Sequence, residues 1–238
     1  MNIDVDLTAR KEVPRWLAYS SSVLTVLAAL AVSSLALITL GVDPIAGYTT
    51  MFITPWTSQF GISNVLEKTV PLVLAGLAVY LPLRAGLWNI GATGQIYIGA
   101  IVGTWIGINI ALPSIALIPL MLLGAAVGGA LWGFIPGYLR AKWDVNEIIV
   151  SLLIAYAAIR INGYMVRGPM QGGAGNFPVS AVLPDPAQLP TIPILDAHLG
   201  VLVALLAAIV VYIFVQKTNV GYEITYTGSN PDAARQAG

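Results

Sequence analysis

Long apolar stretches separated by short polar ones run through this chain of 238 residues. Six stretches have the character of candidate membrane spans: 16–40, 69–83, 90–112, 115–139, 148–166 and 199–216. A helix needs about 20 mainly apolar residues to cross the ~30 Å hydrocarbon core of a bilayer. The pattern therefore predicts an all-α polytopic membrane protein, a bundle of about six transmembrane helices. The second stretch is short and carries Pro71, Gly76 and Pro82, which favours a broken helix there.

The composition agrees with a chain dissolved in lipid. Hydrophobic residues make up 57% of it and charged residues only 9%, whereas soluble domains carry about 25% charged residues. The net charge is zero, so no nucleic-acid partner is indicated. The chain has no cysteine and a single histidine, His198, which excludes disulfide scaffolds, thiolate zinc sites and cysteine nucleophiles. It also lacks a phosphate-binding G-x-x-x-x-G-K-[ST] loop, so any nucleotide hydrolysis belongs to another chain.

Basic residues orient the predicted spans. With the N-terminus inside, eight of the eleven lie on the cytoplasmic side: Arg10, Lys11, Arg15, Arg84, Arg140, Lys142, Lys217 and Arg235. This bias follows the positive-inside rule. We therefore expect a multi-pass protein of the cell membrane (plasma or inner membrane). Residues 1–15 would be a cytoplasmic N-terminal segment, 16–216 a transmembrane domain, and 217–238 a cytoplasmic loop.

Two long connections fall on the outer side, at 41–67 and 168–198, and both are rich in Pro, Gly, Ser and Thr. The second holds six of the fifteen prolines and is expected to be extended and turn-rich. Either these segments are simple spacers, or they form a structured cap that meets an extracytoplasmic partner.

Glycines recur every fourth residue in the third and fourth spans. Gly99, Gly103 and Gly107 share one helix face, and Gly124 and Gly128 repeat the spacing. Such faces let helix backbones approach closely in lipid. We therefore expect these two spans to pack against each other.

Polar residues concentrate between the second and third spans, in the glycine-rich stretch 84–95. Irregular backbone at membrane depth is tolerated only where protein buries it or water lines it. A re-entrant segment on a translocation path is one interpretation, and an ordinary cytoplasmic turn with a glycine C-cap is the other. In the fifth span, Tyr156 and Asn162 either face a polar path or bond a neighbouring helix. Before that span, Asp144 and Glu147 have the spacing of a capping box.

No catalytic set is present, and all eleven acidic residues lie outside the apolar cores. Ion-coupled carriers often keep an ionisable residue in mid-membrane. Its absence argues against an ion-coupled carrier. At the C-terminal end, Ser229 or Asn230 can cap a short helix that begins at Pro231, with Asp232 beside the positive end of the helix dipole. A helix this short needs a docking partner. Since the chain then stops, we expect it to be a fragment of a longer protein.

Four motifs occur in order along the chain, at 89–95 (NIGATGQ), 145–150 (VNEIIV), 167–169 (RGP) and 228–235 (GSNPDAAR). With this order and topology the chain resembles the membrane permease subunit of ATP-binding-cassette importers for simple sugars and nucleosides. That group is related to the ribose and branched-chain amino-acid permeases. Within it, the chain looks most like the first permease of nucleoside importers.

The resemblance implies two functional regions. The first is the translocation path, at Asn89, Gly91, Gly94 and Gln95; to these we add Thr93, and also Tyr156 and Asn162 as uncharged polar residues of the fifth span. The family often has an acidic residue where this chain has Thr93. The second is the coupling helix that sits on the ATPase, matched by Gly228, Ser229, Asn230, Pro231, Asp232, Ala233, Ala234 and Arg235. No catalytic or metal-binding residue is expected.

The resemblance also implies the partners: an ATPase subunit, a second permease (homologous or identical), an extracytoplasmic substrate-binding protein and the bilayer. This chain would bind no cofactor, since ATP and Mg belong to the ATPase. The expected function is import of nucleosides or simple sugars by alternating access. The alternatives are a permease for branched-chain amino acids or ribose-type sugars, or else an ion-coupled transporter or channel.

Overall fold

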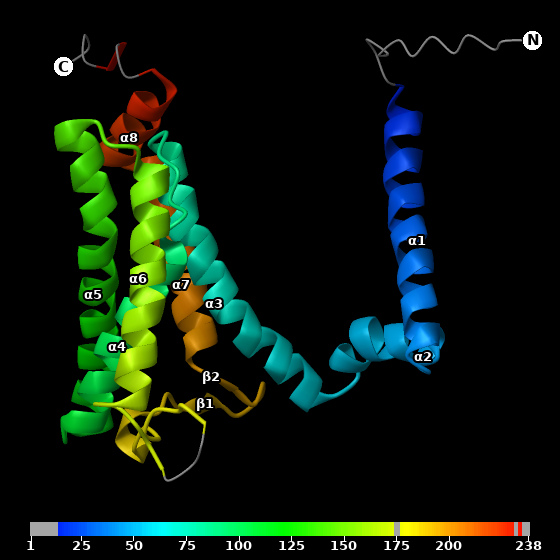
Figure 1. The fold of residues 1–238 in the computed structure, drawn as a ribbon, viewed down its shortest axis with the longest axis horizontal. Coiled ribbons are helices and arrows are strands. Elements are labelled where there is room, and N and C mark those ends of the chain that lie inside the picture. The colour runs from blue at the N-terminus through cyan, green and yellow to red at the C-terminus, as the bar shows by residue number, and fades with distance from the viewer. Residues whose placement is uncertain (1–13, 174–176, 231–232, 235–238) are drawn as a thin grey trace, which may run out of the picture. The chain divides into compact units, whose positions relative to one another are not determined.

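The computed structural model describes residues 14–173, 177–230 and 233–234, which fall into two compact units, 1–62 and 63–238 (Figure 1). The helices are α1 (Arg15–Thr39), α2 (Pro44–Tyr48), α3 (Gln59–Arg84), α4 (Ala92–Asn109), α5 (Ser114–Trp143), α6 (Glu147–Arg167), α7 (Gly200–Lys217) and α8 (Asn219–Ser229). Short helical turns lie at Thr49–Ile53, Thr54–Trp56 and Asp185–Ala187, and β1 (Thr191–Ile192) pairs antiparallel with β2 (Ala197–His198). The predicted all-α membrane protein is confirmed.

Long helices occupy all six predicted stretches. Five of them, namely α1 from Tyr19, α3, α5, α6 and α7, are long and apolar enough to cross a membrane. The helix α4 is not among the five, because its 18 residues include four glycines and the polar Thr93, Gln95 and Asn109. A sixth crossing by α4 therefore stays a prediction.

The unit 1–62 is built on α1 and the helical turns that follow it. Asp43 caps α2 by accepting a hydrogen bond from the backbone N–H of Ile45 at 2.9 Å. The Tyr48 hydroxyl donates to the carbonyl of Leu30 at 2.5 Å and lies 3.1 Å from the Ser34 hydroxyl, which ties α2 to α1. The first long connection is thus largely helical.

In the unit 63–238, α4 packs most extensively against α5 and next against α6 (Figure 1). The glycine faces make this possible. A Cβ at Gly99 would lie 2.8 Å from the carbonyl oxygen of Ala125, and one at Gly128 would lie 2.8 Å from Val102 Cγ2. Gly99, Gly103, Gly107 and Gly128 are all buried. The expected packing of these two spans is confirmed.

The helix α3 is continuous from Gln59 to Arg84, although Pro71 and Pro82 lie inside it. The broken helix expected there is therefore wrong. It ends in a Schellman turn, in which Gly86 has φ +75° and the N–H groups of Gly86 and Leu87 donate to the carbonyls of Leu83 and Pro82. The glycine C-cap is thus the correct one of the two interpretations for the start of 84–95. Residues 87–89 are irregular, and α4 begins at Ala92.

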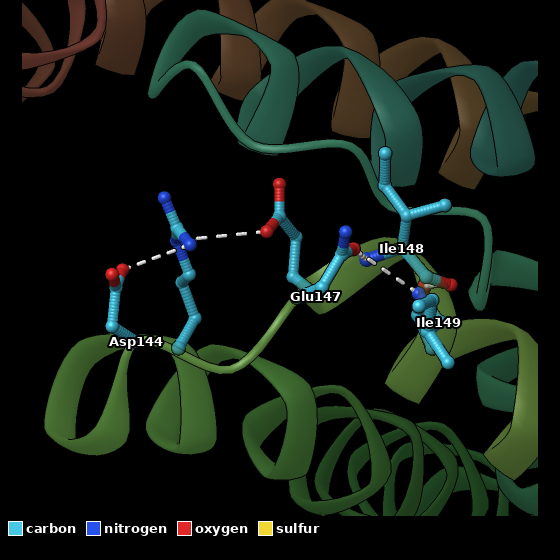
Figure 2. A network of polar contacts seen from close by, with 7 residues as sticks. Asp144, Glu147, Ile148 and Ile149 are labelled. Carbon is cyan, nitrogen blue, oxygen red and sulfur yellow. Dashed lines mark hydrogen bonds and ion pairs between the residues drawn. The ribbon is translucent and has the colours of Figure 1, made fainter.

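The capping box predicted at the junction of α5 and α6, with Asp144 as the cap, is wrong. Asn146, not Asp144, caps α6, and its Oδ1 accepts from the N–H groups of Ile148 and Ile149 (Figure 2). Asp144 instead ends α5 in the left-handed conformation, with φ 53°. Arg140 pairs with the Asp144 carboxylate at 2.9 Å and, through Nε, with that of Glu147 at 3.6 Å. Asp144 lies in the sharp turn between α5 and α6, two residues before the N-cap position of α6, so it does not cap that helix.

The described part of the second long connection, between α6 and α7, is structured and is not a simple spacer, while its contact with an extracytoplasmic partner stays a prediction. Met170, Ala187 and Ala197 are buried in it, and β1 and β2 form a hairpin. Two hydrogen bonds attach the hairpin to α3. The Ser63 hydroxyl donates to the carbonyl of Asp196 at 2.6 Å, and the Glu67 carboxylate accepts from the N–H of His198 at 3.0 Å.

The helix α8 was not expected from the sequence, which placed a loop after residue 217. Thr218 caps it, since its hydroxyl oxygen accepts from the N–H of Gly221 at 3.1 Å. Gly221 is buried directly against the backbone of Phe214 and Val215, so α8 folds back beside the end of α7.

We expect Gly99→Ala to lower the free energy of unfolding by about 1 to 3 kcal/mol, because its Cβ would press on the backbone of α5. The matched control is Gly76→Ala on α3, where nothing lies within 4 Å of the new Cβ. This control should be neutral, or stabilising by up to about 1 kcal/mol through helix propensity. Denaturant unfolding of the purified protein in detergent measures both. Equal effects of the two substitutions would contradict the packing role of Gly99.

Candidate functional site

A cavity of about 410 Å³ lies between α3, α5, the start of α6 and the segment that joins α3 to α4. It is lined by Leu77, Ala78, Leu81, Pro82, Leu87, Trp88, Asn89, Gln95, Ala130, Gly133, Pro136, Gly137, Glu147 and Ser151. Its size suits a small solute, and its wall combines apolar surface with a few polar groups, as small-molecule sites do.

Pro82 influences one wall of the cavity through the hydrogen bonding of α3. Because proline has no N–H, it leaves the carbonyl four residues earlier, that of Ala78, without a helical partner. The side-chain amide of Asn89 donates to this carbonyl at 3.0 Å. A break in the hydrogen-bond ladder of α3 thus fixes the position of Asn89 on the cavity wall.

Asn89 and Gln95 form a reciprocal amide pair. The Asn89 amide nitrogen donates to Gln95 Oε1 at 3.2 Å, and the Gln95 amide nitrogen donates to Asn89 Oδ1 at 3.2 Å. Each amide keeps capacity for a further hydrogen bond, because an amide has two donors and an acceptor oxygen with two lone pairs. The pair can therefore offer both donors and acceptors to a neutral polar solute.

Glycines hold this pair against α5 and α6. The side chain of Gln95 lies over Gly133, where a Cβ would come within 2.7 Å of its amide nitrogen. Gly94 lies against Ala155, since a Cβ at residue 94 would be 2.8 Å from the Cα of Ala155, and Gly91 lies against Ser151. Larger residues at these glycines would push the start of α4 away from the cavity.

Glu147 is the one charged residue among the described residues that line the cavity, and its side chain is 14% exposed. Arg140, outside the lining, lies 3.6 Å from its carboxylate and offsets the charge (Figure 2). The other polar side chains of the lining are Asn89, Gln95, Ser151 and the indole of Trp88. The arrangement favours hydrogen bonding to a neutral ligand over ion pairing.

The structure brings together four of the seven residues predicted for the path, and separates the other three from them. Asn89 and Gln95 line the cavity, and Gly91 and Gly94 lie directly behind them. Thr93 is exposed and is not in the lining, although it follows Gly91 by two residues.

The two predicted path residues of α6 also lie apart from this cavity. Tyr156 is 62% exposed. Asn162 lines a separate hollow of about 600 Å³, together with Arg160 and Arg167, near the end of α6 that leads to the hairpin segment.

Sequence reasoning missed three contributors: Pro82, Glu147 and Ser151. The proline could have been found, because a proline inside a span always frees the carbonyl four residues before it. Ser151 could not, because nothing in an apolar span marks which side of the helix meets a cavity, and the spacing of Glu147, which precedes the span, indicates only a helix cap.

The predicted coupling segment, residues 228–235, begins in contact with the end of α3 and the residues that follow it. Gly228 packs on the backbone of Arg84, Ala85 and Gly86, so closely that a Cβ at residue 228 would lie 2.8 Å from the backbone nitrogen of Gly86. Of the two predicted capping residues, Asn230 makes the bond: its Oδ1 accepts from the N–H of Ala233 at 3.0 Å. Ser229 instead donates to the carbonyl of Thr225. Pro231, Asp232 and Arg235 lie outside the described residues.

Within the described ranges, no group of three or more His, Asp or Glu side chains could hold a metal ion.

Residues 61–238 match the family described as the permease component of branched-chain amino acid transport systems. The chain is 55% identical to the glucose ABC transporter permease protein TsgB13 of Haloferax volcanii, over all of this chain and 66% of that protein. It is 32% identical to the guanosine ABC transporter permease protein NupP of Bacillus subtilis, over 90% of this chain and 63% of that one. For the nucleoside ABC transporter permease protein NupB of Lactococcus lactis the identity is 29%, over 86% and 59%.

The chain thus spans somewhat less than two thirds of the length of these curated relatives. No solved structure matches it significantly.

The role of Pro82 can be tested with a double-mutant cycle. Asn89→Leu should destabilise the protein by about 1 to 3 kcal/mol, because it leaves the Ala78 carbonyl and the Gln95 amide without their partner. In the background of Pro82→Ala the same substitution should cost about 1 kcal/mol less, since a helical N–H at residue 82 would satisfy the Ala78 carbonyl. Thermal unfolding in detergent gives the four stabilities. Additive effects would contradict the link between Pro82 and Asn89.

Proposed function

Since this chain belongs to the family of permease components of branched-chain amino acid transport systems, we propose that it is part of the membrane permease of an ATP-binding-cassette importer for simple sugars. The observation that carries the proposal is the reciprocal Asn89–Gln95 amide pair on the cavity wall. Sugars are neutral and rich in hydroxyl groups, so they need paired donors and acceptors rather than a countercharge. The identity of 55% to a glucose permease supports the same substrate class.

Transport proceeds by alternating access, and the cavity is a part of the solute path that lies towards one membrane face. That face is cytoplasmic, because it carries Arg84, Arg140 and Lys142 and so follows the positive-inside rule. The segment 228–235, which starts beside Gly86, docks on a separate ATPase subunit. ATP and Mg bind to that ATPase, and the free energy of hydrolysis reaches the permease through this segment.

The importer includes two further proteins. A second permease subunit, homologous or identical to this one, completes the membrane pathway, and an extracytoplasmic binding protein delivers the solute. The structured segment between α6 and α7 lies at the opposite end of α3 from the cavity loop, so it faces the binding protein.

Nucleosides are the second candidate substrate. The names of the relatives NupP and NupB support this class. A nucleobase edge also presents neighbouring donors and acceptors that would match two side-chain amides.

Uptake of labelled glucose should require the full-length gene and should stop when the partner ATPase is inactivated. We expect unlabelled glucose to compete, and guanosine and leucine not to compete. The measurement compares deletion cells with complemented cells. Gene-dependent uptake of labelled guanosine but not of labelled glucose would replace the sugar with a nucleoside, and glucose uptake that survives loss of the ATPase would contradict the importer.

Gln95→Met should lower the uptake rate by about tenfold or more, because a site that hydrogen-bonds its substrate loses about 1.4 kcal/mol or more with one partner. The matched control is Asn109→Leu, which also removes an amide from α4. Asn109 donates to the carbonyl of Trp105 within its own helix and lies outside the cavity lining. Equal uptake by the two variants, at equal amounts in the membrane, would contradict the role of Gln95.

A further inference from the structure

The helix α3 is attached to other segments near both of its ends within the unit 63–238. Near its N-terminal end, Ser63 donates to the Asp196 carbonyl at 2.6 Å and Glu67 accepts from the His198 N–H at 3.0 Å. Ser63 is only 6% exposed, so its bond is shielded from solvent. These two bonds join α3 to the residue that directly precedes β2 and to the last residue of β2.

At its C-terminal end α3 meets α8. The guanidinium of Arg84 donates through Nη2 to the Thr225 hydroxyl at 3.2 Å, and Gly228 packs directly on Arg84, Ala85 and Gly86. No side chain stands between the two backbones at Gly86 and Gly228, because both residues are glycine. A displacement of α8 therefore acts directly on the last turn of α3.

Between these ends, α3 makes few packing contacts with the other described helices. It borders the cavity through Leu77, Ala78, Leu81 and Pro82, and it packs extensively against no other helix among the described residues. Its carbonyl at Ala78 holds Asn89, and through it Gln95. Movement of α3 would therefore change the amide pair as well.

We propose that α3 is the mechanical link between the hairpin β1–β2 and α8, with Glu67 and Thr225 as the positioning residues at its two ends. The 17 residue-to-residue steps from Glu67 to Arg84 span about 26 Å at 1.5 Å per residue, which is most of the bilayer core. A continuous helix transmits an axial shift or a tilt over this length. The inference rests on the proposed function: docking of the binding protein at the hairpin reaches the ATPase through α3, and ATP binding reaches the amide pair by the same route.

The test uses the reconstituted importer in lipid, with its ATPase, second permease and binding protein. Thr225→Val removes the hydroxyl at constant shape, whereas Thr225→Ser keeps it. Glu67→Met removes the acceptor, whereas Glu67→Gln keeps an amide oxygen at the same position. The measurement is ATP hydrolysis, basal and stimulated by sugar-loaded binding protein.

We expect Thr225→Val and Glu67→Met each to lower the maximal stimulation by about three- to tenfold, the range given by loss of the one hydrogen bond that each side chain makes outside its own helix. The half-saturating concentration of binding protein and the basal hydrolysis should stay within about twofold, and the Ser and Gln variants should behave like the wild type. A merely structural role would instead lower basal hydrolysis and the amount of assembled complex. Full stimulation in Thr225→Val and Glu67→Met would overturn the link.

The double variant Glu67→Met/Thr225→Val makes the test sharper. If both residues act through one helix, the double variant should lose no more stimulation than the worse single variant. Losses that multiply would mean two independent routes and would overturn the proposal. Wild-type protein that shows no ATP-dependent uptake would refute the proposed function, a result distinct from normal uptake with unaffected variants, which refutes the link alone.

Discussion

Close approach of helix backbones at glycine holds the unit 63–238 together, because apolar side chains gain no free energy by leaving one apolar solvent for another. In lipid, association depends on van der Waals contact and on hydrogen bonds, both of which need short distances. The face Gly99, Gly103 and Gly107 brings α4 onto α5, and Gly133 accepts the side chain of Gln95. The contact of Gly86 with Gly228 repeats the principle where α8 meets α3. The cavity and its amide pair exist because these backbones are close.

Buried polar groups in this unit are placed by the free-energy cost of leaving a donor or acceptor without a partner. Pro82 creates an unpaired carbonyl on Ala78, and Asn89 satisfies it. Asn89 then satisfies Gln95, whose own backbone lies against Gly129. The unpaired carbonyl of α3 therefore fixes the position of the polar pair, and no charged residue in mid-membrane is needed to build this site.

The sequence predicted the features that depend on composition and on spacing along one helix. The apolar stretches predicted the long helices, the four-residue glycine repeats predicted the packing of α4 on α5, and Asn230, one of the two expected capping residues, makes the capping bond. The predictions failed where contacts with neighbouring segments, and not the local sequence, determine the structure. Asp144 has the composition of a helix cap but ends α5, because the turn to α6 needs a left-handed residue there. The faces of Thr93, Tyr156 and Asn162 could not be predicted, since helices that are apolar all round carry no signal of which side meets a cavity.

The segment 84–95 joins the two regions that we propose for the solute path and for coupling to the ATPase, and its local structure determines how movement would pass between them. Gly86 sits in a Schellman turn whose two hydrogen bonds return to Pro82 and Leu83, inside the last turn of α3. A turn bonded in this way cannot flex independently of the helix it ends. A displacement of α8, as proposed above, would therefore be transmitted from Gly86 to α3 at Pro82. Because Pro82 is also the residue that frees the Ala78 carbonyl for Asn89, the turn of helix that would receive this displacement also holds the amide pair on the cavity wall.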